Sequence, residues 1–295
     1  MRVTNAGHYQ ILQENIRRTS AGQASATERI ASGRKYSRLS EDPDAIVKAM
    51  RLRGEEQQLE TYTGAASDAR AWLATQDGAL QSATNVLQRV RELTIAASND
   101  ALSDDAVAGL AQEIEGLRGQ LVVLANTRFQ DRSVFAGFAD QTVTMSGSAA
   151  TFTGDAGEVN RRVGSGQLVQ VNVSGGEVFG FTAGDDVFSV LTDIADHIRA
   201  RDVASLSGTD LDRVDARFSD VTANLGRVGA RMNVVDQAEA VAVDQIDAVR
   251  LRRSNLEDVD MAEAAVELTA AQNAYEAVIA MVGRLQMPTL ANFLR

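Results

Sequence analysis

A seven-residue repeat of leucine between residues 43 and 99 constrains the fold more than any other feature of this sequence. One slot of the repeat holds Leu52, Leu59, Ala66, Leu73, Leu80 and Leu87. The slot three residues after each of these is mostly apolar, so the segment carries the narrow stripe by which one long helix packs against another. Pro43 suits the first position of this helix, because no N–H donor is needed there. A helix of this length extends on the order of 80 Å, which predicts an elongated protein.

Heptad spacing recurs in two further stretches, at residues 107–124 and 211–249. The connection before the first of these is short, and Ser103 is a candidate N-cap, so we expect this helix to fold back antiparallel on the leucine-repeat helix. The second stretch is long enough to form another rod, and we expect it to pair with the leucine-repeat helix. A shorter helix is predicted from Asp185 to about Ile198.

The periodicity changes near Arg128, where short alternating runs replace the helical pattern. Strands are predicted at residues 142–145, 151–153, 167–173 and 177–181. Gly175 and Gly176 separate the last two runs, which predicts a hairpin there. We therefore expect a small β-rich insert at the tip of a helical hairpin, dependent on the helices for part of its stability.

Both chain ends are predicted to form amphipathic helices with weak apolar stripes. The N-terminal stripe is half polar or small, and Gly33 ends that helix. The C-terminal helix begins near Met261, after a break at which Asp260 and Glu263 resemble a capping box. Such helices are marginal alone, so we expect them to stay largely disordered in the monomer and to order between subunits. The N-terminal helix packed on its own chain is the alternative. The predicted assembly residues are Leu12, Ile16, Ile30, Met261, Leu268, Tyr275, Val278 and Val282.

Together these patterns predict a mainly α fold, a long antiparallel coiled-coil-like helical bundle with a small β-rich insert and amphipathic terminal helices. Five segments are expected. They are an N-terminal assembly helix and turn at 1–42, rod segments at 43–135 and 184–254, the insert at 136–183, and a C-terminal assembly helix at 255–295.

Composition excludes several classes of function. The net charge is −11 without basic runs, which argues against nucleic acid or an anionic membrane surface as a partner. Cysteine is absent and only His8 and His197 occur, so no thiolate chemistry is possible and no metal-ligand spacing is present. His197 is expected to be a surface or packed residue. No nucleotide or nucleophile motif occurs, and we predict no catalytic, cofactor or metal site. The first ten residues lack a signal-peptide core, so we expect a soluble protein that, if it leaves the cell, does so without a cleaved leader.

Three motifs resemble those of a known protein family. They are TERIASG at residues 27–33, LQRVREL at 87–93 and NLEDVDMA at 255–262. In their order and spacing, over nearly the whole chain, they resemble the flagellin superfamily. Further motifs are similar to the branch of that superfamily found between hook and filament: EDP at 41–43, SNDALSDD at 98–105, LANT at 124–127, VFAG at 134–137, FTGD at 152–155, VQVN at 169–172 and VFG at 178–180. Phe152 stands where that branch usually has Tyr.

The resemblance implies a structural protein of the bacterial flagellum, needed for motility and exported unfolded through the type III apparatus with help from a cytosolic chaperone. It implies a ring at the hook–filament junction, with further copies of the chain, a neighbouring hook-associated protein and flagellin as partners, and no cofactor. The terminal helices would form the inner tube, the rods the next layer and the insert the outer surface. The alternatives are flagellin itself, the filament subunit, and a generic coiled-coil scaffold; an enzyme is the contrasting class.

Overall fold

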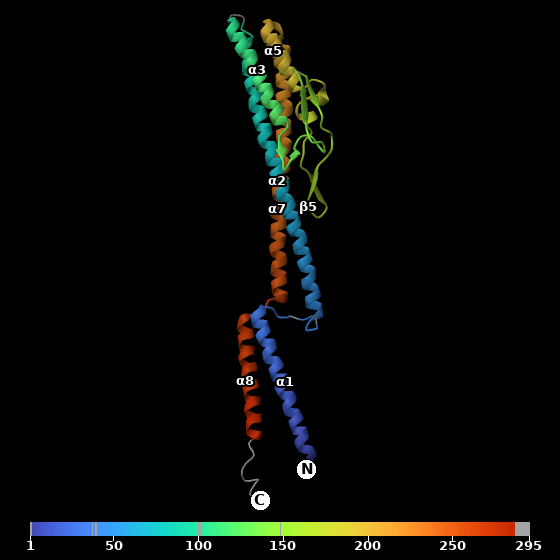
Figure 1. Ribbon diagram of the computed structural model, residues 1–295, viewed down its shortest axis with the longest axis vertical. Coiled ribbons are helices and arrows are strands. Elements are labelled where there is room, and N and C mark those ends of the chain that lie inside the picture. Colours follow the sequence, from blue (N-terminus) through green and yellow to red (C-terminus); the bar gives the residue numbers. More distant parts are fainter. Residues whose placement is uncertain (1, 37, 39, 100–101, 148, 287–295) are drawn as a thin grey trace. The chain divides into compact units, whose positions relative to one another are not determined.

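The computed structural model describes residues 2–36, 38, 40–99, 102–147 and 149–286 and is mainly helical (Figure 1). The chain forms two compact units. The smaller is built from Met1–Gln58 and Gln245–Arg295, and the larger from Leu59–Asp244. The division into five segments stays a prediction. The principal helices are α1 (Arg2–Ser32), α2 (Pro43–Ala97), α3 (Asp104–Ala125), α5 (Val187–Ala200), α7 (Thr209–Glu257) and α8 (Met261–Gln286), with a short α6 (Val203–Ser207).

The helix boundaries follow from local capping chemistry, and the predicted starts and stops are confirmed. Pro43 opens α2, and the Asp42 Oδ1 before it accepts a hydrogen bond from the Ala45 N–H at 2.9 Å. Ser103 caps α3 in the same way, accepting from the Ala106 N–H. Gly33 follows α1 with a φ of 68°, a backbone conformation that favours glycine.

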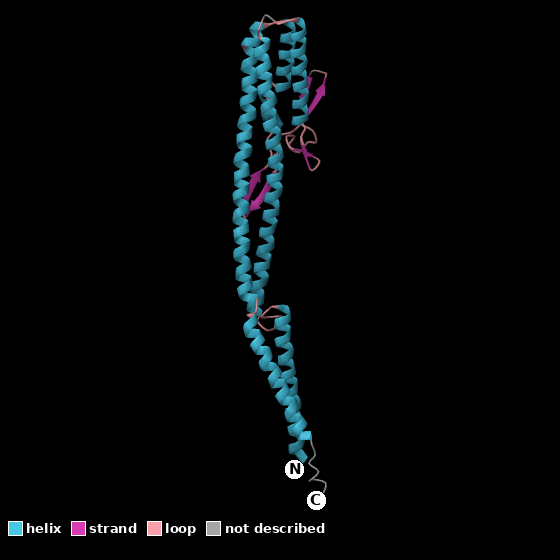
Figure 2. Cartoon of the chain, turned by 90° about the vertical axis from the view of Figure 1, so that its left-hand side faces the viewer, coloured by secondary structure: helices cyan, strands magenta, loops and turns pink. Residues whose placement is uncertain are grey.

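In the larger unit, the long helices pack along one another around a continuous apolar core (Figure 2). Ion pairs between Arg91 and Asp215 and between Arg70 and Asp236 show that α2 and α7 run antiparallel. The predicted pairing of the two rods is thus confirmed. The leucine-repeat slots of this unit are all buried: Leu59, Ala66, Leu73, Leu80 and Leu87.

The helix α3 folds back on α2, as the short connection predicted. Arg89 of α2 forms a 2.7 Å ion pair with Glu113 of α3. On its other side α3 packs against α5, where Glu115 pairs with Arg199 at 2.6 Å. The helical body of the larger unit is therefore made of α2, α3, α5 and α7.

The described chain between α3 and α5, which includes the predicted insert, contains small antiparallel hairpins, each of two strands. They pair β1 (Arg128–Phe129) with β2 (Arg132–Ser133), β3 (Val143–Ser146) with β4 (Ala149–Phe152), and β5 (Asn160–Gly164) with β6 (Gln167–Gln170). In the second hairpin Thr144 faces Thr151, and in the third Arg161 faces Val169. Because the hairpins are not joined into one sheet, they depend on contacts with the helices.

The predicted strand at residues 177–181 and its hairpin around Gly175 are wrong. This stretch forms a short helix α4 (Gly175–Val178), capped by the Ser174 hydroxyl, and a 3₁₀ turn η1 (Phe181–Ala183). Gly175 is needed for close approach, because a Cβ there would lie 2.3 Å from the Thr142 methyl group and its N–H donates to the Phe135 carbonyl at 2.8 Å. The strand β6 therefore forms its hairpin with β5, the strand that precedes it in the chain.

The insert also does not lie at the tip of the helices. The Gln76 side-chain amide donates to the Val134 carbonyl at 2.6 Å, and Arg231 donates to the Asn172 carbonyl at 2.7 Å. These contacts place the insert against the middle of α2 and of α7. The reason is the length of α3, which has 22 residues against 55 in α2, so that the insert begins partway along the longer helix.

Candidate assembly surface

The helices α1 and α8 of the smaller unit lie side by side (Figure 1), and Arg29 forms a 2.9 Å ion pair with Glu267 between them. The covered positions recur with heptad spacing and form one seam, here called the terminal seam. It consists of Leu12, Ile16, Thr19, Gln23, Ala26 and Ile30 in α1 and of Ala264, Leu268, Ala271, Tyr275, Val278 and Val282 in α8. Among these side chains only Ala26 and Ala264 are buried, at 3% and 2% exposure, and the rest are half-buried.

The structure brings seven of the eight predicted assembly residues together in the terminal seam. Leu12, Ile16 and Ile30 lie on its α1 side, and Leu268, Tyr275, Val278 and Val282 lie on its α8 side. Met261 lies outside the seam, at the first position of α8, and is 54% exposed. Their contacts with other subunits stay a prediction.

Other apolar side chains of α1 and α8 are exposed. The exposed members are Tyr9, Ile11, Val266, Ile279 and Met281. Val266 is 70% exposed and, with Ala265, Thr269, Ala270 and Asn273, it lines a shallow hollow of about 420 Å³ on α8. Single exposed apolar residues are common on proteins, but a two-helix pair with a half-covered seam and further apolar groups outside it retains much apolar surface.

The segments that connect this pair to the rest of its unit are hydrogen-bonded to each other. Arg34 lies opposite Asp258 in an antiparallel bridge. On either side of this pair, the Val259 N–H donates to the Gly33 carbonyl at 3.0 Å and the Lys35 N–H donates to the Glu257 carbonyl at 2.6 Å. We call residues 33–35 and 257–259 the joint. The sequence showed a break at each segment but gave no sign that the two would pair.

The predicted break before α8 is confirmed by its cap. The helix α7 ends at Glu257 and α8 begins at Met261. Asp260 Oδ1 accepts hydrogen bonds from the N–H groups of Ala262 and Glu263, at 2.8 and 3.3 Å. Asp260 therefore serves as the N-cap that sets the start of α8.

Next to the joint, a carboxylate of α2 is held by two arginines of α7. Glu56 is 7% exposed, and its carboxylate accepts a hydrogen bond from the Arg250 Nε at 2.6 Å and forms an ion pair with Arg253. One turn earlier, Arg53 pairs with Glu257 at 2.5 Å. Glu55 occupies the slot three residues after Leu52, which the heptad pattern assigns to the apolar stripe, yet Glu55 is exposed and its neighbour Glu56 makes the contact. The partners lie about two hundred residues apart, so sequence spacing gave no signal for them.

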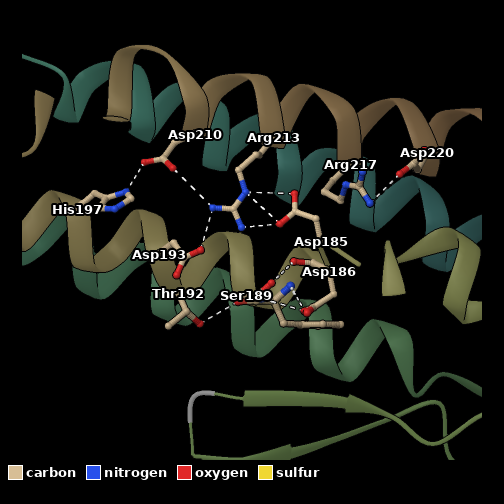
Figure 3. A network of polar contacts seen from close by, with 11 residues as sticks. Asp185, Asp186, Ser189, Thr192, Asp193, His197, Asp210, Arg213, Arg217 and Asp220 are labelled. Carbon is tan, nitrogen blue, oxygen red and sulfur yellow. Dashed lines mark hydrogen bonds and ion pairs between the residues drawn. The ribbon is translucent and has the colours of Figure 1, made fainter. Parts of the chain in front are cut away.

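A second polar cluster lies in the larger unit, where α5 meets α7 (Figure 3). Arg213 binds the carboxylates of Asp185 at 2.5 Å and Asp193 at 2.8 Å, and the hydrogen bonds that Arg213 donates to Asp185 are the main reason that the pKa of Arg213 is raised. His197 Nδ1 lies 2.7 Å from the buried Asp210 carboxylate. His197 is thus half-buried against Asp210, one of the two placements expected for it, and the cluster fastens α5 to α7.

In the described part of the chain, no three His, Asp or Glu side chains are grouped so as to hold a metal ion. The described helices also include none with the length and apolar character needed to cross a membrane.

Comparison with known proteins identifies both ends of the chain. Residues 3–140 match the model of the N-terminal helical region of bacterial flagellin, and residues 211–294 match the model of its C-terminal helical region. Flagellar hook-associated protein 3 of Escherichia coli is 25% identical over 96% of this chain and 98% of its own length. A flagellin of Listeria monocytogenes is 24% identical over 87% of this chain and 86% of its own length.

Among solved structures, the flagellar junction protein FlgL of Legionella pneumophila superimposes with a TM-score of 0.61 at 17% identity. The match covers 71% of this chain and 99% of that protein. It shows that the two chains share a fold, in which long helices carry a small β-containing insert.

Proposed function

Because the chain belongs to the bacterial flagellin family, we propose that it is a structural subunit of the flagellum that forms the junction between hook and filament. The match to hook-associated protein 3 over nearly the full length of both chains supports this assignment. In this proposal the protein acts by assembling with its neighbours.

The observation that carries the assembly proposal is the half-covered terminal seam. Full burial of a Leu, Ile or Val side chain contributes about 1.5–3 kcal/mol, and a half-buried residue realises only part of this. Leu12, Ile16 and Leu268 therefore have burial left to gain, which helices of neighbouring subunits would supply. Assembly would order the terminal helices by covering the seam and the exposed groups around it.

The resemblance further supports a set of partners and a route. The partners would be other copies of the chain, a neighbouring hook-associated protein, flagellin, and a cytosolic chaperone that holds the chain before type III export. The protein would then be found outside the cell, at the base of the filament.

Immunogold labelling tests the location. A peptide tag in the exposed turn at Ser165 and Gly166, between β5 and β6, leaves both terminal helices unaltered. We expect one band of label where the hook ends. Label along the filament would instead support the second candidate, flagellin itself, which the similarity to the Listeria flagellin over 87% of this chain favours.

A deletion strain tests the role. We expect cells lacking the gene to carry hooks without filaments and to shed flagellin into the medium. The wild-type gene should restore filaments and a Leu268→Asp variant should not, whereas the exposed neighbour change Gln272→Asp should restore them. Normal filaments in the deletion strain would contradict the junction role.

A further inference from the structure

The joint fixes the end of α1 and the start of α8 relative to each other. Arg34 follows the glycine that ends α1, and Asp258 precedes the cap of α8 by two residues. Two backbone hydrogen bonds flank this pair, so α1 and α8 leave the joint as the two arms of a hairpin. The two chain segments are therefore in contact at the joint, although more than two hundred residues lie between them in sequence.

The joint is anchored to the helices of the same unit by Glu257. Its backbone carbonyl accepts the Lys35 N–H, and its side chain pairs with Arg53 of α2. The Lys35 ammonium adds a hydrogen bond to the Asn255 carbonyl at 3.3 Å. One turn away, Glu56 holds Arg250 and Arg253 of α7. The joint therefore depends on contacts outside the terminal seam and can form without it.

The packing of the terminal seam is best near the joint. Its two buried residues, Ala26 and Ala264, lie within about two helical turns of the joint, and so does the ion pair between Arg29 and Glu267. The other seam residues, from Ile30 next to the joint out to Leu12 and Val282, are half-buried. Both buried residues of the seam and its ion pair thus lie in the half of the seam next to the joint.

Helix pairing that starts at a closed joint has the smallest entropy cost, because the loop between the first contacts is short. Each later turn then adds contacts to an existing nucleus. We propose that the joint is the nucleus of the terminal helix pair, that it forms in the monomer, and that assembly zips α1 and α8 from the joint toward the chain ends. The inference rests on the proposed function, since it concerns the order of events during assembly.

A disulfide across the joint tests whether it forms in the monomer. Arg34 and Asp258 are a pair without hydrogen bonds between them, the type in which antiparallel Cα atoms come within about 4.5 Å, which suits a disulfide. The chain has no cysteine, so the double variant Arg34→Cys with Asp258→Cys carries the only two thiols. We expect the monomer to oxidise to the intramolecular disulfide. A monomer that stays reduced, or that gives only crosslinked dimers, would overturn the proposal.

Hydrogen exchange of the wild-type monomer tests the direction. We expect amides of residues 24–32 and 261–270 to exchange about tenfold more slowly than those of residues 9–18 and 275–283, as for local opening from the far ends. In the double variant, oxidation should slow exchange next to the joint first, with the reduced form of the same protein as its control. Uniform exchange along both helices, or slower exchange at the chain ends, would overturn the proposal.

Loss of one joint hydrogen bond provides an independent check. Val259→Pro removes the N–H that donates to the Gly33 carbonyl, whereas Val259→Ala keeps it. We expect the proline variant alone to lose protection in both α1 and α8, with exchange of the larger unit unchanged as evidence that the protein is folded. Protection that is equal in the two variants would contradict the nucleus. The junction assignment fails separately, if the wild-type protein is not at the end of the hook.

Discussion

The side chain of Asn126 pairs with the backbone of Val143 as a neighbouring strand would. Asn126 Oδ1 accepts the Val143 N–H at 3.1 Å, and its Nδ2 donates to the Val143 carbonyl at 2.9 Å. The same Oδ1 also accepts the Thr142 N–H at 3.0 Å. Because Asn126 is the C-cap of α3, one amide fastens the start of β3 to the end of a helix and fixes where the insert departs from the helical body.

We predict that Asn126→Asp destabilises the larger unit by about 1–3 kcal/mol, since the carboxylate cannot donate to Val143 and leaves a polar group unpaired. Chemical denaturation of the full-length protein measures this difference. Asn85→Asp, at an exposed position of α2, is the control and should be nearly neutral. Equal effects from the two changes would show that the Asn126 contacts contribute nothing specific.

Glu56→Gln should weaken the smaller unit by about 1–3 kcal/mol, because it removes the charge that holds two arginines in a partly buried contact. The adjacent change Glu55→Gln provides a matched control, since Glu55 is exposed. Amide exchange at residues 245–257 reports the effect locally. If the Glu55 variant exchanged as fast as the Glu56 variant, net charge rather than the ion pairs would be responsible.

Gly137→Ala should lower the free energy of unfolding by more than about 2 kcal/mol, because a conformational and a steric penalty coincide. The residue has a φ of 70°, and a Cβ would lie 2.0 Å from the Asp155 Oδ1. Gly166→Ala separates the two, since Gly166 has a φ of 76° with open space around it. It should cost about 1–2 kcal/mol, the conformational penalty alone. Thermal unfolding of both variants measures the comparison, and similar losses would exclude a steric role for the Asp155 contact.

Most of the helical fold could be predicted because its determinants lie within single segments. The leucine slots from Leu59 to Leu87 are buried because a heptad on one helix needs only a partner stripe. Caps such as Asp42, Ser103 and Asp260 act on N–H groups two or three residues away. The terminal seam was visible for the same reason, although Met261 falls outside it.

The features that could not be predicted from the sequence are contacts between distant segments. The pattern at Gly175 resembled a hairpin turn, but its conformation follows from the Phe135 carbonyl and the Thr142 methyl group. Glu56 lies outside the leucine-repeat slots, and its contact with Arg250 of α7 has no signal in the local sequence. The two segments of the joint pair through their backbones, so the amino-acid types at residues 33–35 and 257–259 did not predict the pairing. The last residues of the C-terminal segment, 287–295, lie outside the described part of the chain.

The central claim is that subunit contacts complete the ordering of the terminal helices. Hydrogen exchange at residues 9–32 and 261–283, compared between monomer and assembled polymer, tests it most directly. We predict fast exchange in the monomer, most of all far from the joint, and strong protection in the polymer, while the larger unit stays protected in both. Terminal helices as protected in the monomer as the buried core of α2 would contradict the account.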